Sequence, residues 1–137
     1  MSPWTAEEAR ALTAPDEVRI VTRRRDGTLR RPVTIWVVGD GRRVFIRSTN
    51  GRTAAWFRWV LATGTGRLVA RGTAHEVELT EAAEDDLDRV DAAYRAKYAR
   101  YASIVDHLVE PGPRAATLEV HPASSVTPPT PGRETGP

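Results

Sequence analysis

The stretch RRPVTIWVVGDGRRVFIRSTNG, residues 30–51, decides how this chain folds. Residues 32–38 are mostly apolar and rich in β-branched and aromatic side chains, as expected of a central strand that is buried on both faces. The following Gly39-Asp40-Gly41 provides a tight turn, because glycine adopts positive φ at little cost. We therefore predict two antiparallel strands, at about 30–38 and 43–48, joined by a hairpin.

The flanking sequence extends this hairpin to six strands. Val18 and Ile20 occupy alternate positions, which indicates a strand at about 17–23, and Asp26-Gly27 is a hairpin signal that joins it to the next strand in an antiparallel meander. Further strands are expected at 67–71, 74–79 and 115–120, and helices at 5–12, at 53–62 and within 80–110, where one helix or two with a bend fit the pattern.

The predicted elements fit a small mainly β protein of the α+β class. Six strands are enough to close a small antiparallel barrel, and tight turns between the first three exclude a parallel sheet, whose strands need long crossovers. The 137 residues, 40% of them hydrophobic, suffice for one domain. We expect this domain to span 1–121, followed by a disordered Pro-, Ser- and Thr-rich tail at 122–137.

Charge is distributed unevenly along the chain. Between Arg19 and Arg71 there are 13 arginines and two acidic residues, a formal charge of +11, whereas the whole protein carries +2. Residues 76–110 hold ten acidic and four basic side chains. The basic half is expected to face an anionic partner, a phosphate or the protein's own acidic segment. Complementarity between the two halves also predicts a homodimer.

Several kinds of chemistry lack the residues that they require. The chain has no cysteine, and its three histidines, at 75, 107 and 121, lack the spacing of a metal site. It contains no P-loop, Gly-x-Gly-x-x-Gly fingerprint or Ser/His/Asp arrangement. Without a signal-peptide-like start or an apolar run of about 18 residues, we expect a cytoplasmic protein with no metal site and no membrane partner.

The strongest local feature is residues 47–53, Arg-Ser-Thr-Asn-Gly-Arg-Thr, which join a predicted strand to a predicted helix. Free amides at a helix start, together with Arg47 and Arg52, can bind an anion. The alternative is a plain connector, capped by Asn50 or Thr53, in which both arginines are solvated.

Aromatic side chains recur near this connector. Trp36 lies in the second strand and Trp56 on the following helix, while Tyr94, Tyr98 and Tyr101 share one face of the later helical segment. Packing in the core is the alternative role for each of them.

Three short motifs, RPVTIW at 31–36, VFIRSTNG at 44–51 and AWF at 55–57, are together similar to the flavin-binding split-barrel superfamily. From about Trp4 to His121 the chain most resembles the deazaflavin-dependent nitroreductases and a neighbouring family of small uncharacterised actinobacterial proteins. The resemblance implies a six-stranded antiparallel split β-barrel, pyridoxamine-phosphate-oxidase-like, that forms a homodimer with a cofactor at the subunit interface.

The resemblance also implies where a cofactor lies. The matching contact positions for its phosphate and ring are Arg47, Ser48, Asn50, Gly51 and Arg52. To these we add Trp36 and Trp56 as walls beside the ring, and Tyr94 or Tyr98 as the catalytic residue that donates a proton or shapes the substrate side. This chain departs from the nitroreductase pattern at Trp59, where those proteins have Asn, and a bulky indole there could fill part of the cofactor pocket.

Three functions follow in order of preference. The first is a small oxidoreductase that transfers hydride to or from a small organic molecule with a deazaflavin coenzyme or FMN. The second is a cofactor-free split barrel that binds or cyclises a small metabolite in specialised metabolism. A nucleic-acid binder ranks last, because the arginines are strung along strands rather than gathered in one patch. The absence of a conventional acid/base pair suits hydride transfer better than hydrolysis.

Overall fold

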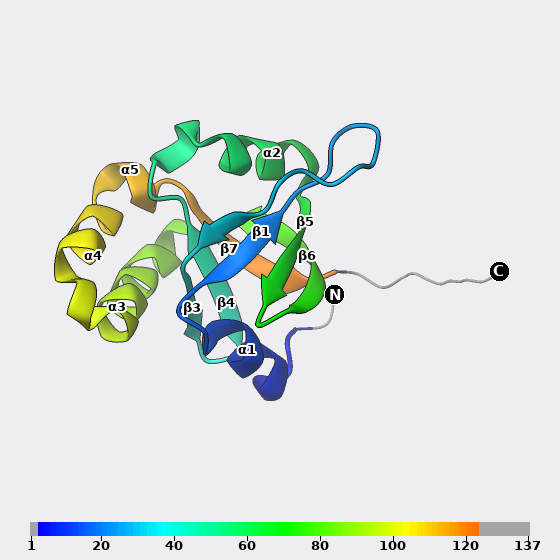
Figure 1. Cartoon of the computed structure of the whole chain (residues 1–137). Helices are drawn as coiled ribbons and strands as arrows, with labels where there is room; N and C mark the ends of the chain where they lie inside the picture. Colours follow the sequence, from blue (N-terminus) through cyan, green and yellow to red (C-terminus); the bar gives the residue numbers. More distant parts are fainter. Residues whose placement is uncertain (1–2, 124–137) are drawn as a thin grey trace.

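Within residues 3–123, the part of the chain that the computed structural model describes, seven antiparallel strands form one sheet that curls into a nearly closed barrel (Figure 1). Their order in the sheet is β2-β1-β5-β6-β7-β4-β3. The predicted tail lies outside the described residues from position 124 onward. The strands are β1 (Val18–Val21), β2 (Val33–Ile35), β3 (Val37–Asp40), β4 (Arg43–Arg47), β5 (Thr65–Ala70), β6 (Thr73–Glu81) and β7 (Thr117–Pro122).

Helices cover the barrel on three sides (Figure 1). The α-helices are α1 (Ala6–Thr13), α2 (Ala55–Thr63), α3 (Leu87–Lys97), α4 (Ala102–Leu108) and α5 (Pro111–Arg114). Short 3-10 turns are η1 (Gly51–Thr53), η2 (Glu84–Asp86) and η3 (Ala99–Tyr101). Among the described residues, no helix is both long and apolar enough to cross a membrane.

The sheet has seven strands rather than the predicted six because the second predicted strand is divided at Trp36. Its first half, β2, pairs with β1, and its second half, β3, pairs with β4. The predicted meander is therefore present, but each half of the middle strand serves a different neighbour, as the bend of a closing barrel requires. We predicted that this strand is buried on both faces. That prediction is wrong for β2, because Thr34 is exposed, and it is confirmed for β3, because Val37 and Val38 are both buried.

Two hydrophobic clusters hold the layers together. One fills the barrel and includes Leu12 of α1 and Phe57 of α2. The other lies between β3–β4 and the α3–α4 pair, and comprises Val38, Phe45, Val90, Tyr94, Tyr98, Val105 and Leu108. Burying a large apolar side chain is worth roughly 1.5–3 kcal/mol, so the second cluster is enough to fix the helices on the outer face of the sheet.

The segment predicted as helix within 80–110 is two helices with a bend. Its first residues extend β6, α3 begins only at Leu87, and η3 separates α3 from α4. The short helix α5 was not predicted, although Pro111 stands at its first turn, where a fixed φ favours helix and no amide is lost.

Arg47 anchors the helical layer to the sheet. Its Nη1 donates to Asp91 Oδ1 at 2.6 Å and to the Leu108 carbonyl at 3.0 Å, and its Nε donates to the Thr117 hydroxyl at 2.8 Å. The residue is 2% exposed. The expectation that both connector arginines are solvated is therefore wrong for Arg47. Asp91 also accepts from Arg114, so one carboxylate connects β4, α3 and the end of α5.

A second arginine of β4 repeats this pattern nearer the start of α3. Arg43 donates to Asp86 at 2.7 and 3.0 Å and to Glu119 of β7 at 2.8 and 3.0 Å. Its guanidinium lowers the pKa of Asp86. We predicted three possible anionic partners for the basic half, and the structure shows one of them, the acidic segment of the same chain. Charge complementarity that we took to predict a homodimer is therefore used in part within one chain.

Lys97, the one lysine in the sequence, ties the end of α3 to two other parts of the chain. Its ammonium donates to the carbonyls of Thr13 and Pro15, at 2.6 and 2.7 Å, and of Val37, at 2.6 Å. Burial nevertheless outweighs the attraction of Asp16 and lowers the pKa of Lys97 to about 8. The lysine therefore holds the α1–β1 link against the point where β3 begins.

Replacing Arg47 with Ala should lower the free energy of unfolding by about 1.5–3 kcal/mol, because its buried hydrogen bonds to Asp91, Leu108 and Thr117 would be lost while Asp91 keeps Arg114. Urea unfolding followed by circular dichroism measures this loss. Arg95→Ala is the matched control: its ion pair with Asp106 is exposed, so it should cost less than about 1 kcal/mol. Equal stability of the two variants would show that Arg47 does not anchor the fold.

The free energy of unfolding should rise as the pH increases from about 8 to about 10. The pKa of Lys97 is about 8 in the folded chain and 10.5 as a free side chain, so the unfolded chain binds more protons in this window. Stability therefore increases as the pH rises. Above this window the raised pKa values of Tyr94 and Tyr98 act in the opposite direction. Urea titrations at several pH values test this, and Lys97→Met should flatten the slope; a falling wild-type profile contradicts it.

Candidate functional site

A pocket of about 410 Å³ opens where the sheet is split between β2 and the end of β4. We call it the tryptophan pocket, because Trp36 and Trp56 both line it. Its other lining residues are Glu17, Val33, Thr34, Ile35, Arg47, Thr49, Asn50, Ile104 and Leu108. Four of the predicted site residues, Trp36, Trp56, Arg47 and Asn50, are thus brought together.

Trp36 is held rigidly by Tyr98. The two rings stack with centroids 3.9 Å apart and an angle of 4° between their planes. The Tyr98 hydroxyl donates to the Asp16 carbonyl at 2.6 Å and accepts from the Val37 amide at 3.3 Å. Burial raises the pKa of Tyr98 to about 12. Tyr98 therefore supports the indole from behind, and it does not line the tryptophan pocket.

Trp56 belongs to the first turn of α2 and is 8% exposed. It packs edge-on against Phe57, with ring centroids 6.0 Å apart. Trp59, which the sequence suggested could fill the pocket, instead packs on the barrel core and carries the Arg30 guanidinium 4.3 Å above its ring. The tryptophan pocket is consequently left open on this side.

One guanidinium nitrogen of Arg47, a residue that lines the pocket, makes no hydrogen bond within residues 3–123. Its Nε and Nη1 are used by Thr117, Asp91 and Leu108, whereas its buried Nη2 finds no partner within residues 3–123. An unmade hydrogen bond to a buried charged group is costly, so a ligand oxygen at this point would relieve the cost. Because the Arg47 side chain is fully buried, a ligand acceptor would reach Nη2 only if the pocket wall around it moved.

The turn after β4 is built differently from the predicted anion cradle. Asn50 makes no side-chain cap, Thr53 donates to the Asn50 carbonyl, and α2 begins at Ala55 with Ala54 as an N-cap that offers no side-chain hydrogen bond. Capping by Asn50 or Thr53 is therefore also wrong. Gly51, at φ 71°, lies against Gly112, where an added Cβ would come within 3.4 Å of the carbonyl oxygen.

Two of the predicted contact residues point elsewhere. Arg52 donates to Glu81 at 2.5 and 3.3 Å and to the Ala115 carbonyl at 2.7 Å, and this pairing lowers the pKa of Glu81. Ser48 is 1% exposed, and its hydroxyl has no hydrogen-bond partner in the described part of the chain. Neither residue lines the tryptophan pocket.

Tyr94 is fully buried between the sheet and α3. Burial raises the pKa of Tyr94 above its ordinary range, while the Arg47 guanidinium, 5.4 Å from the ring, opposes the shift. Like Tyr98, it does not line the tryptophan pocket. The two predicted catalytic tyrosines thus lie behind the pocket wall and not on its surface.

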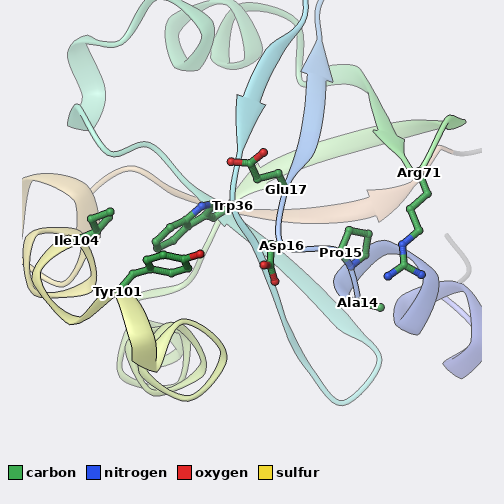
Figure 2. A pocket seen from close by; sticks show the side chains of 8 residues that line it. All are labelled: Ala14, Pro15, Asp16, Glu17, Trp36, Arg71, Tyr101 and Ile104. Carbon is green, nitrogen blue, oxygen red and sulfur yellow. The ribbon is translucent and has the colours of Figure 1, made fainter.

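A larger pocket of about 870 Å³ adjoins the first one (Figure 2). We call it the Tyr101 pocket; it is lined by Ala14, Pro15, Asp16, Glu17, Trp36, Arg71, Tyr101 and Ile104. Figure 2 shows the aromatic rings at one end, Arg71 at the other and the two carboxylates between them. Glu17, Trp36 and Ile104 line both pockets. The sequence did not single out Glu17 or Ile104, because neither lies in a recognisable motif.

Solved structures with the same fold include several flavin-type proteins. The structure of an F420-H2-dependent reductase superposes with a TM-score of 0.59 at 15% identity, covering 77% of this chain and 94% of that one. A protein described as a domain-swapped dimer gives 0.59 at 15%, covering 85% and 87%. A candidate pyridoxamine 5′-phosphate oxidase from Listeria innocua gives 0.56 at 10%, covering 83% and 89%.

These similarities show the fold, and they confirm the predicted pyridoxamine-phosphate-oxidase-like split barrel. A comparison with curated proteins gives no match. The model of one protein family matches residues 8–120, almost the whole described region. The chain therefore belongs to the family described as "Uncharacterized protein conserved in bacteria", DUF2255.

Proposed function

We propose that this protein is an oxidoreductase that binds a flavin-type coenzyme, deazaflavin in preference to FMN, and transfers hydride to or from a small organic molecule. The observation that carries the proposal is the tryptophan pocket, which two indoles line together with Arg47, a residue whose buried Nη2 has no hydrogen-bond partner in residues 3–123. Its fold is also that of an F420-H2-dependent reductase, and F420 is a deazaflavin.

The pocket has the size and chemistry for a planar ring system. Its volume of about 410 Å³ lies within the range of roughly 300–1,000 Å³ typical of ligand sites. Trp36 provides a flat wall that Tyr98 keeps in place, and Trp56 lies on the helix side. Arg47 Nη2 suits a ring carbonyl oxygen better than a phosphate, because Asp91 already balances the charge of this guanidinium.

A coenzyme phosphate would lie nearer the turn. Thr49 and Asn50 line both the tryptophan pocket and a third pocket of about 570 Å³, which also contacts Gly51. The first turn of α2 has no side-chain cap, so its amides are available to an anion. Arg52 lies beside this turn but is paired with Glu81, so it would have to exchange one anion for another.

In this proposal the coenzyme supplies the hydride chemistry, and the protein supplies position and polarity. Trp36 and Trp56 orient the ring and exclude water, and Arg47 Nη2 donates to one oxygen. Tyr98 acts through Trp36 as a positioning residue, and Tyr94 keeps the Arg47 side chain in place. A proton-donor role for either tyrosine would require the wall of the pocket to open, because both are 1% exposed or less.

We also propose a homodimer that completes this site. One structure with the same fold is described as a domain-swapped dimer, which supports the idea. Trp36 and Thr34 lie at the free end of the sheet, where β2 has only β1 as a neighbour, so a second copy could cover the pocket from outside.

The second candidate is a cofactor-free protein that binds a small metabolite. The specific observation in its favour is that Arg47 and Arg52 are already paired with Asp91 and Glu81. Neither arginine is therefore a free counter-ion for phosphate, whereas a neutral ligand with one acceptor oxygen would need no exchange of ion pairs.

Titrating the coenzyme-free protein with a reduced deazaflavin coenzyme and with FMN tests the two proposals against each other. Wild type should bind at least one of them, and Trp36→Ala should weaken binding by about 1–3 kcal/mol, the usual value of a stacking contact. Trp59→Ala, which removes an indole outside the pocket, should leave the affinity unchanged. If wild type binds neither compound, the metabolite-binding alternative replaces the first proposal.

The Arg52–Glu81 pair provides a test of the phosphate position. Glu81→Gln should tighten coenzyme binding, because it frees Arg52 without changing the size of the side chain, and Arg52→Ala should weaken it by about 1.5–3 kcal/mol. Isothermal titration calorimetry with wild type and both variants measures the differences. If Glu81→Gln has no effect while Arg52→Ala does, Arg52 holds the turn through Ala115 and does not bind the phosphate.

A further inference from the structure

Two aromatic side chains, Trp36 and Tyr101, form one end of the Tyr101 pocket. Trp36 and Tyr101 meet there with ring centroids 5.7 Å apart and planes tilted by 41°. Tyr98 covers one face of the indole, so its remaining surface is available to the pockets. Tyr101 and Ile104 expose 40% and 45% of their surface side by side on this pocket, so they present an adjacent pair of apolar side chains. A ligand with an apolar body would cover them.

The carboxylates of this pocket are not equivalent. Asp16 is paired with Arg100 at 2.7 Å, so its charge is balanced within the chain. Glu17 makes no ion pair or hydrogen bond within residues 3–123. It lines the Tyr101 pocket, the tryptophan pocket and a smaller pocket that Arg19 and Arg71 also line, which we call the Arg19 pocket. The pocket therefore holds one unbalanced negative charge beside the indole.

The nearby cations form no ion pair with Glu17 in residues 3–123, and the Lys97 ammonium, which donates to Pro15, is held by three carbonyls. Arg71 lies at the far end of the pocket, beyond Pro15 and Asp16 (Figure 2). Arg19 and Arg71 line the Arg19 pocket together with Glu17, but neither arginine forms an ion pair with Glu17. The Arg100 guanidinium carbon lies 5.2 Å from the centroid of the Tyr101 ring, and the guanidinium forms an ion pair with Asp16. Glu17, an exposed carboxylate, is thus the acidic group here that a cationic ligand would meet without displacing an ion pair.

We infer that the Tyr101 pocket binds a small organic cation, an ammonium group on an apolar or aromatic body, with Glu17 as its counter-ion. An aromatic face attracts a cation through the ring quadrupole, and an adjacent carboxylate adds to that attraction. A carboxylate ligand would be repelled at the same place. Arg71, at the other end, would accept an anionic substituent only on a ligand long enough to reach it.

This inference stands without the coenzyme, since every residue that carries it belongs to the chain itself. If the coenzyme site proposed above is also correct, the cation site names the class of substrate that the oxidoreductase would act on. Trp36 and Glu17 line both pockets, so a cation in the Tyr101 pocket would lie next to the ring site and would be the substrate class of the proposed oxidoreductase.

The test uses the full-length, coenzyme-free protein and three probes of similar size: benzyltrimethylammonium, benzyl alcohol and benzoate. Affinities are measured by isothermal titration calorimetry, and the contact region by chemical-shift changes of the Trp36 and Tyr101 ring signals. The cation should bind at least about fivefold more tightly than the neutral alcohol, a ratio within the range of cation–π attraction. Benzoate should bind most weakly.

Two substitutions locate the site. Glu17→Gln keeps the shape and removes the charge, and Tyr101→Leu keeps apolar bulk and removes the ring; each should weaken cation binding about fivefold or more and leave benzyl alcohol unchanged or nearly so. Glu84→Gln, an exposed acid in η2 away from the pocket, is the matched control and should bind like wild type.

Three results would overturn the inference. They are equal affinity for the three probes, tightest binding of benzoate, which would make Arg71 the determinant, and wild-type affinity for the cation in Glu17→Gln. Thermal melts of each variant identify any that fails to fold. Because no coenzyme is present, failure of the proposed coenzyme site would leave the outcome unaffected.

Discussion

The buried contact between Arg47 and Asp91 is the interaction on which the rest of the structure depends. Arg47 ends β4 and reaches β7 through Thr117, while Asp91 belongs to α3 and is shared with Arg114. A guanidinium taken out of water is tolerated only when its charge and most of its donors are matched. Meeting that requirement fixes the helical layer on β3–β4, and with it the rings of Tyr94 and Tyr98.

This placement is what creates the two pockets. With α3 and η3 in place, Tyr98 stacks on Trp36 and Tyr101 lies beside it. Trp36 is thereby held as a wall shared by the tryptophan pocket and the Tyr101 pocket. The same arginine leaves its buried Nη2 without a hydrogen-bond partner in the described part of the chain. Stability and ligand chemistry therefore share a residue, and a change at Arg47 affects both.

The charge pattern has a similar double role. Arg43, Arg47, Arg52 and Arg67 of the basic half are paired with carboxylates that come later in the chain, at Asp86, Asp91, Glu81 and Glu76. Part of the asymmetry along the sequence therefore serves folding. Beside the site, Glu17 is an acidic residue that forms no ion pair within residues 3–123.

Local sequence patterns were enough to predict an antiparallel barrel, the order of most of its elements and the neighbourhood of the site, because alternation, turn residues and helical apolar periodicity depend on local geometry. They could not show that the second strand divides at Trp36, since a bend of this kind is set by closure of the whole sheet. Likewise, only the tertiary structure buried Arg47, turned Arg52 to Glu81, placed Tyr94 and Tyr98 behind the pocket wall and left Glu17 unpaired. Each of these features depends on which carboxylate or aromatic ring from a distant part of the sequence lies next to the residue, and packing of the whole domain decides that.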